Sequence, residues 1–254
     1  RAESKMTLVD THCHIQEADY PLDREQTLQA AIEAGVTKVL VVGTDMKSSV
    51  DAVKFARERE NVWAIVGVHP HETKHGIDGL AELATEPKVV GIGEIGLDYY
   101  YNHSPREMQI EILNQQLEIA LKRNLPISFH VREAFDDFWP IFDNFHGIRG
   151  VLHSFTDSIS NMGKGLERGL LIGVNGIATF NKDLEQAKMY KSIPLERMVL
   201  ETDAPFLAPK PYRGKTNQPA FVHNIAEFLA SDRGDDLNGI AASTTKNAET
   251  TFQI

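Results

Sequence analysis

Short apolar runs alternate with longer amphipathic segments along the whole chain. The runs are rich in Val, Ile and Leu, which is typical of strands buried on both faces of a parallel sheet. The segments between them carry apolar residues at helical spacing. The pattern predicts strands at residues 7–12, 38–44, 62–69, 89–94, 126–130, 150–153, 170–175 and 198–202. It predicts helices at residues 21–35, 46–59, 77–84, 105–123, 133–145, 158–168, 182–191, 219–230 and 235–252, with a kink or break at Pro140.

This alternation predicts an α/β fold, a single-domain (β/α)8 TIM barrel. Strands separated by helices pair in parallel, and 254 residues suit eight strand–helix units. The alternative is an open doubly wound sheet. Residues 91–96 match the G-x-G-x-x-G pattern of dinucleotide-binding folds. The match is weak, because the glycines overlap a predicted strand, a charge lies inside, and no helix follows directly.

Six histidines and carboxylates stand at the ends of predicted strands. Chemistry in parallel barrels occurs at the carboxyl ends of the strands. Side chains two residues apart on a strand share a face, so neighbouring histidines after the first strand point together. We therefore expect one pocket around His12, His14, Glu94, His130, His153 and Asp203.

These residue types favour a divalent metal centre. Imidazoles and carboxylates suit zinc, manganese and nickel, and magnesium is a further candidate. The carboxylate of Glu94 has two oxygens and can bridge two cations, whereas an imidazole cannot. Asp203 could orient a water and accept its proton, so Asp203 and Glu94 are the predicted catalytic residues. Taken singly, His130 or His153 would more often be a hydrogen-bonded core histidine than a ligand, and the alternative for His12 and His14 is a pair of polar loop histidines.

Composition limits the classes of function. The net charge of −10 disfavours extended, charge-driven binding to nucleic acid, although bound cations would still allow local phosphate recognition. The single cysteine, Cys13, allows no internal disulfide, and no apolar run has membrane-spanning length. We expect a cytoplasmic protein with no membrane partner and, by default, a monomer. Residues 1–5 are expected to be an expression remnant preceding a domain at 6–254.

Motifs in every part of the chain resemble those of one family, the TatD-type metal-dependent hydrolases of the amidohydrolase-like barrels. They are Val-Asp-Thr-His-Cys-His at 9–14, Gly-Val-His-Pro-His at 67–71, Gly-Glu-Ile-Gly-Leu-Asp-Tyr at 93–99, Pro-Ile-Ser-Phe-His-Val-Arg at 126–132, Leu-His-Ser-Phe at 152–155, Leu-Glu-Thr-Asp-Ala-Pro at 200–205 and Arg-Gly-Lys-Thr-Asn at 213–217.

The resemblance implies a two-cation site and a nuclease activity. One cation would be held by His12, His14, Glu94 and Asp203, and the second by Glu94, His130 and His153. Family members are associated with metal-dependent DNase activity, including 3′→5′ exonuclease action in some.

We therefore predict a metal-dependent hydrolase that cleaves DNA phosphodiester bonds with a water activated by two metal ions. The alternatives are metal-dependent hydrolysis of an ester, amide or lactone, including deacylation of aminoacyl-tRNA, and a non-catalytic binding barrel. A non-catalytic barrel would be expected to have a substitution at one of the six metal-binding residues. Predicted substrate contacts are His69, Arg132, Arg213 and Lys215, with ordinary surface or loop roles as the alternative.

Two further sets of residues are candidates for supporting roles. Tyr99, Tyr100 and Phe155 could stack on nucleobases, with packing favoured for Phe155. Asp10 and Glu201 could orient ligand histidines through hydrogen bonds.

Overall fold

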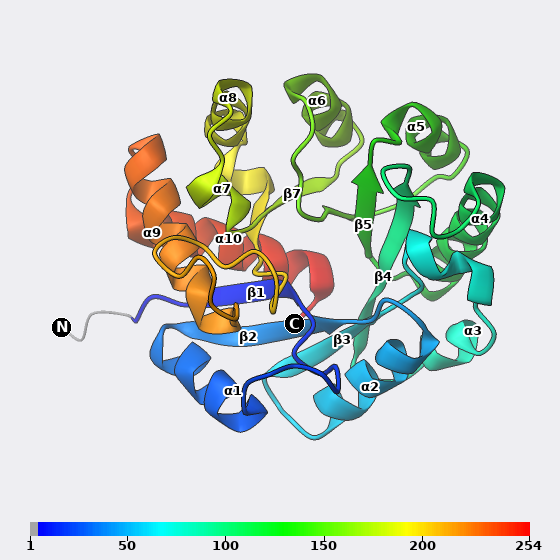
Figure 1. The fold of residues 1–254 in the computed structure, drawn as a ribbon, viewed down its shortest axis with the longest axis horizontal. Coiled ribbons are helices and arrows are strands. Elements are labelled where there is room, and N and C mark those ends of the chain that lie inside the picture. Colours follow the sequence, from blue (N-terminus) through cyan, green and yellow to red (C-terminus); the bar gives the residue numbers. More distant parts are fainter. Residues whose placement is uncertain (1–4) are drawn as a thin grey trace.

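The computed structural model describes residues 5–254, which form a closed parallel barrel (Figure 1). The strands follow one another around the sheet in chain order, from β1 to β8. They are β1 (Leu8–Cys13), β2 (Val36–Val42), β3 (Val62–Val66), β4 (Val89–Asp98), β5 (Ile127–Arg132), β6 (Gly150–Leu152), β7 (Leu171–Val174) and β8 (Met198–Leu200). The predicted (β/α)8 barrel is thus confirmed.

Helices surround the strands (Figure 1). They are α1 (Arg24–Glu33), α2 (Met46–Arg57), α3 (Leu80–Leu83), α4 (Arg106–Arg123), α5 (Phe135–Asp143), α6 (Ile159–Glu167), α7 (Ile177–Phe180), α8 (Leu184–Ser192), α9 (Val222–Arg233) and α10 (Leu237–Phe252). Short 3-10 turns lie at η1 (Pro70–His75), η2 (Leu195–Arg197) and η3 (Pro219–Phe221).

Several local predictions differ from the structure. The strand predicted to end at Glu94 continues to Asp98 as β4. Helix α5 runs through Pro140 without a break. Its apolar face packs on β5, where the rings of Phe129 and Phe138 lie 5.1 Å apart, and this packing outweighs the missing backbone hydrogen bond. The elements η1 and α7 lie in segments for which the sequence pattern predicts no helix or strand.

The barrel interior is a separate apolar cluster, distinct from the layer between strands and helices. Its members are Val9, Leu40, Val42, Ile65, Val151, Leu171 and Val199 from the strands, with Ala248 and Phe252 from α10. Phe252 lies near Gly91 at the start of β4. Helix α10 therefore closes the amino-terminal end of the barrel and leaves the carboxyl end for a site.

Strands β8 and β1 close the barrel largely through a buried carboxylate. Asp10 on β1 accepts hydrogen bonds from the backbone N–H of Thr202 at 3.0 Å and from its hydroxyl at 2.6 Å. The backbone N–H of Asp203 donates to the carbonyl of His12 at 2.8 Å. These contacts place the segment after β8 directly beside the His12–His14 segment.

Two expectations concern features away from the barrel. Residues 1–4 of the expected expression remnant lie outside the described residues. Among the helices that the structure describes, none combines the length and apolar character needed to cross a membrane.

Candidate metal centre

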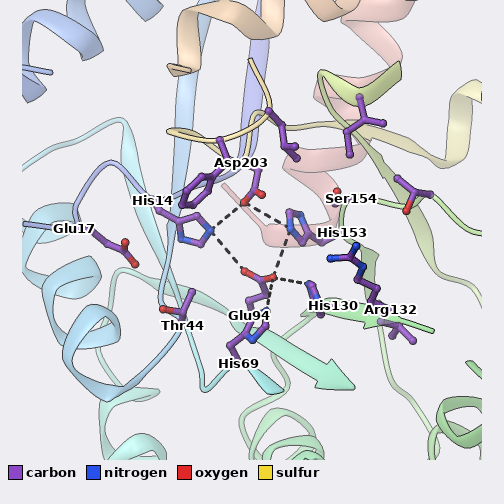
Figure 2. A pocket seen from close by; sticks show the side chains of 15 residues that line it. His14, Glu17, Thr44, His69, Glu94, His130, Arg132, His153, Ser154 and Asp203 are labelled. Carbon is purple, nitrogen blue, oxygen red and sulfur yellow. Dashed lines mark hydrogen bonds and ion pairs between the residues drawn. The ribbon is translucent and has the colours of Figure 1, made fainter. Parts of the chain in front are cut away.

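A cavity of about 560 Å³ opens at the carboxyl ends of the strands, and the predicted ligands surround its floor (Figure 2). His14, Glu94, His130, His153 and Asp203 line it directly. His12 lies just beneath, with its ring stacked on that of His153 at 3.4 Å. The structure therefore brings all six predicted side chains to one place.

Glu94 lies at the centre and presents each carboxylate oxygen to a different set of imidazoles (Figure 2). Its Oε1 is 3.2 Å from Nε2 of His12 and 3.6 Å from Nε2 of His14. Its Oε2 is 3.0 Å from Nδ1 of His130 and 3.6 Å from Nε2 of His153. The side chain is almost fully buried. One carboxylate thus joins two halves of the site.

A β-bulge positions Glu94. Along the β4–β5 ladder, Gly93 pairs with Ser128 and Ile95 with Phe129, which leaves Glu94 without an opposing residue. Such bulges bend a strand and re-aim a side chain beside functional sites. Because β4 continues past the bulge, Glu94 enters the cavity from within a strand rather than from a loop.

Asp203 completes the first half of the site. Its Oδ1 is 3.1 Å from Nε2 of His14, 3.6 Å from Nε2 of His12 and 3.7 Å from Nε2 of His153. Its backbone has φ 59°, in the left-handed region that non-glycine residues seldom adopt. The hydrogen bond from its N–H to His12 holds this conformation.

Three of the imidazoles donate their outer N–H to an acceptor behind them. The acceptors are the Val42 carbonyl for Nδ1 of His14 at 2.8 Å, Glu201 for Nδ1 of His153 at 2.8 Å, and Asp98 for Nε2 of His130 at 2.7 Å. In the neutral ring, this leaves the inner nitrogen as a lone pair directed toward Glu94. Nδ1 of His12 lies 3.1 Å from the Ser128 hydroxyl, which can accept in the same way.

His69 differs in the nitrogen that it presents to the cavity. Its Nδ1 accepts a hydrogen bond from the backbone N–H of His71 at 3.0 Å. The proton of the neutral ring must therefore be on Nε2, which lies 3.5 Å from Oε2 of Glu94. Burial and the nearby His130 lower the pKa of His69 to about 3, so the ring stays neutral. His69 thus presents an N–H donor to the cavity where the others present lone pairs.

The electrostatic balance keeps the central carboxylates ionised. Burial opposes ionisation of Glu94, but the imidazoles of His153, His69 and His12 hold its pKa well below the usual range. Burial likewise opposes ionisation of Asp203, whose pKa is lowered by its hydrogen bond with His14 and by the neighbouring imidazoles. Buried anions of this kind are paired with opposite charge or coordinate metal ions.

Three groups of donor atoms among the described residues are close enough to hold a cation. They are His12, His14, Glu94 and Asp203; His12, His153 and Glu201; and His69, Glu94 and His130. The first equals the set predicted for one cation. The third has His69 where His153 was predicted, although the tautomer of His69 makes its Nε2 a donor. The buried clusters fit a divalent metal centre in their nitrogen and oxygen donor types.

Two of the four predicted substrate contacts line the cavity and two do not. His69 and Arg132 line the cavity. Arg213 and Lys215 are exposed and are absent from the cavity lining. The guanidinium of Arg213 lies over the Phe180 ring at 3.7 Å and donates to the Ala208 carbonyl.

The remaining candidates are also placed by the structure. Phe155 is buried in the core. The Tyr99 hydroxyl donates to Asp137 at 2.6 Å, while Tyr100 is exposed. Glu201 orients His153, as expected, whereas Asp10 bonds backbone and hydroxyl groups and no imidazole ring.

Residues of the site that the sequence analysis did not identify include Asp98 and Phe206. Asp98 accepts a hydrogen bond from the His130 ring and orients it. The motif at 93–99 already contains this carboxylate. Phe206 lines the cavity and is 59% exposed. It follows Pro205 in a loop, where no periodicity indicates which way a side chain points.

Comparison with known proteins agrees with the fold and with a metal-dependent hydrolase. The profile described as TatD related DNase matches residues 9–253. The chain is 34% identical over 253 residues to the uncharacterized metal-dependent hydrolase YabD of Bacillus subtilis, covering 97% of this chain and 99% of the relative. It is 35% identical over 260 residues to the 3'-5' ssDNA/RNA exonuclease TatD of Salmonella typhimurium, with 97% and 99% covered.

A solved structure extends the agreement to three dimensions. The TatD homologue YjjV of Escherichia coli K12 superposes with a TM-score of 0.90 at 28% identity, covering 97% of this chain and 98% of that chain. Profile, relatives and structure all span nearly the full length. The chain therefore belongs to the TatD-related DNase family and is a metal-dependent hydrolase with an amidohydrolase-like barrel.

Proposed function

We propose that this protein is a deoxyribonuclease that cleaves phosphodiester bonds of DNA at a two-cation centre bridged by Glu94. The observation that carries the proposal is the position of Glu94, whose two oxygens face separate sets of imidazoles at 3.0–3.6 Å. A hydrolase with one cation needs no such carboxylate between two nitrogen sets. A pair of cations about 3.5–4 Å apart is common in nucleases and phosphatases.

The chain's own side chains suit both cations. We assign His12, His14, Glu94 and Asp203 to one, because their donor atoms converge. We assign Glu94, His130 and His153 to the second, because both imidazoles direct lone pairs inward. When bound, zinc, manganese, nickel or magnesium ions would supply Lewis acidity to the phosphodiester and lower the pKa of a water molecule.

Asp203 and His69 have separate roles in the proposed reaction. Asp203 lines the cavity and is ionised, so it orients the attacking water and accepts its proton. His69 donates its Nε2–H to a non-bridging phosphate oxygen, because its tautomer leaves no lone pair for a cation. Arg132 lines the same cavity and is the phosphate-binding cation. Arg213 and Lys215 lie outside the cavity lining and contact no scissile phosphate in this proposal.

The relatives support a nuclease and leave the substrate to be tested. Relatives named 3'-5' ssDNA/RNA exonuclease TatD match over nearly the full length. Relatives at similar identity, such as YabD, are named uncharacterized metal-dependent hydrolases. We therefore propose attack from the 3′ end of DNA, with hydrolysis of an ester, amide or lactone as the outcome that the experiment must exclude.

The test compares three substrates with two site variants. The purified protein, loaded with zinc, manganese, nickel or magnesium in turn, is given a single-stranded oligodeoxynucleotide, a phosphodiester chromogen and a carboxylic ester. We expect turnover of the first two. Glu94→Ala abolishes turnover with the barrel still folded by circular dichroism. Asp203→Asn lowers kcat by about 10²–10⁴-fold, the usual range for a lost general base.

The control is Glu185→Gln, which changes an exposed carboxylate in a surface ion pair and leaves turnover unchanged. Hydrolysis of the ester alone would replace the nuclease proposal with the alternative chemistry. Failure to bind cations or turn over any substrate would support a non-catalytic barrel. Full activity in Glu94→Ala would remove the bridging assignment.

A further inference from the structure

Exposed aromatic rings gather at the mouth of the cavity. Six large hydrophobic side chains are exposed among residues 5–254, and the three aromatic ones are Tyr100, Tyr101 and Phe206, at 49%, 45% and 59% exposure. Phe206 lines the cavity. The tyrosines lie beside Arg132, which also lines it (Figure 2 shows Arg132).

Arg132 joins the two tyrosines to the cavity. Its guanidinium lies 3.8 Å from the ring centroid of Tyr100 and 5.6 Å from that of Tyr101. Among the described residues, its side chain forms no ion pair or hydrogen bond, so its N–H groups remain available. Within residues 5–254, Arg132 is also the single Lys or Arg that lines the cavity. A stacked guanidinium with free donors suits a phosphate next to an aromatic base.

Both sets of rings are carried by backbone that is already ordered. Asp98 accepts hydrogen bonds from the N–H groups of Tyr100 at 3.0 Å and Tyr101 at 3.4 Å. The N–H of Phe206 donates to Asp203 at 3.0 Å, and its carbonyl accepts from buried Asn217 at 2.6 Å. Binding of a ligand that stacks on these rings therefore costs little conformational entropy for ordering the loops.

We propose that Phe206 and the Tyr100–Tyr101–Arg132 group are two nucleobase-stacking platforms on opposite flanks of the metal centre, and that they select unpaired DNA. Phe206 follows β8, while the tyrosines and Arg132 lie at the ends of β4 and β5. A strand with one base on each platform places the intervening phosphodiester over the centre. This inference rests on the proposed nuclease function and adds the residues that determine its specificity.

Stacking also explains how an acidic protein can hold a polyanion. The net charge is −10 and the cavity contains a single arginine, so charge attraction is weak. Base–aromatic stacking contributes without regard to net charge and tolerates any base. Bases within a duplex already stack on one another, so only unpaired nucleotides can use both platforms.

The experiment uses two oligodeoxynucleotides of equal length with the metal-loaded protein. One is an ordinary single strand and the other has stable abasic residues at its last two positions. We expect Phe206→Ala and Tyr100→Ala each to raise KM for the ordinary strand by about 10-fold with little change in kcat, given the usual strength of one stacked base. Neither variant changes KM for the abasic strand. Phe206→Trp retains the wild-type KM.

Leu184→Ala is the matched control, because Leu184 is 78% exposed on α8 away from the cavity lining. Equal effects on both strands, or no effect on either, would overturn the platforms while leaving the nuclease proposal intact. Cleavage of neither strand by the wild-type protein would overturn the nuclease proposal and the platforms with it.

Discussion

The role of each histidine at the centre depends on its outer nitrogen. In their neutral forms, His14, His130 and His153 donate outward and direct a lone pair inward. His69 accepts from a backbone N–H and directs a proton inward. The hydrogen-bond partner of the outer nitrogen therefore decides whether each of these four histidines is a cation ligand or a hydrogen-bond donor.

This division predicts different effects for two alanine variants. His153→Ala removes an inward lone pair, so the protein binds about one cation fewer per chain. His69→Ala keeps the cation stoichiometry but lowers kcat by about 10²-fold, the usual loss when one preorganised donor is removed. Elemental analysis of the purified protein gives the stoichiometry, and initial rates on the phosphodiester chromogen give kcat.

His75→Ala is the control, because that histidine is exposed in the same segment as His69 and should change neither quantity. Loss of a cation in His69→Ala would show that His69 is a ligand and would reverse its tautomer assignment.

Among the secondary-structure elements, β4 and β7 shape the centre through backbone features. The bulge in β4 turns Glu94 into the cavity. On β7, Gly173 lies so close to Glu201 that an added Cβ would be 3.0 Å from its carboxylate atoms. That carboxylate holds Nδ1 of His153. Because Gly173 has no side chain, there is room for the Glu201 carboxylate, which orients His153.

We therefore expect Gly173→Ala to weaken cation binding at an intact barrel. The new methyl group displaces the Glu201 carboxylate and releases His153, and lost support of this kind raises the cation Kd by about 10–100-fold. Isothermal titration with Zn²⁺ measures the effect. Gly163→Ala is the matched control, because a Cβ there meets nothing within 4 Å. Equal Kd values in the two variants would contradict the packing argument.

At the scale of the whole molecule, the barrel concentrates buried charge at one end of an apolar interior. Burial by itself would lower the pKa of His14, but its hydrogen bond to Asp203 and the charges of Asp203 and Glu94 raise it to about 10. Burial opposes the same change in His130 and His153, whose carboxylate partners raise their pKa values to about 9. Without cations, the folded protein therefore retains protons on these rings.

The free energy of unfolding of the cation-free protein should accordingly fall at alkaline pH. These folded-state pKa values exceed the ordinary value of 6.5, so the stabilisation is complete below about pH 6.5 and is lost as pH rises through 9–10. Added cations reverse the trend between pH 6 and 8, because they bind deprotonated imidazoles.

Thermal unfolding with a chelator and with excess Zn²⁺ measures both trends. His14→Ala is the reference, since it removes the most strongly shifted ring and should lose less stability between pH 7 and 10 than the wild type. Parallel curves for the two proteins would refute the linkage.

The barrel could be predicted because it depends on local pattern. Apolar runs buried on both faces and helices between them allow few other topologies. Element ends were less predictable: β4 passes through Glu94 because Ile95 and Leu97 pack in the core beyond the bulge. Pro140 lies within α5 because aromatic packing outweighs its local preference.

The sequence by itself determined that this chain forms a barrel and that six residues of metal-binding types, His, Glu and Asp, lie at or near the carboxyl ends of its strands. Strand periodicity and the order of the motifs carry that information. Only the tertiary structure decided that Glu94 divides its oxygens between two sets of imidazoles, that His69 directs a proton inward, and that Phe206 stands at the mouth. These features depend on contacts between segments that are far apart in the chain. His14 and Asp203, for example, are separated by 189 residues.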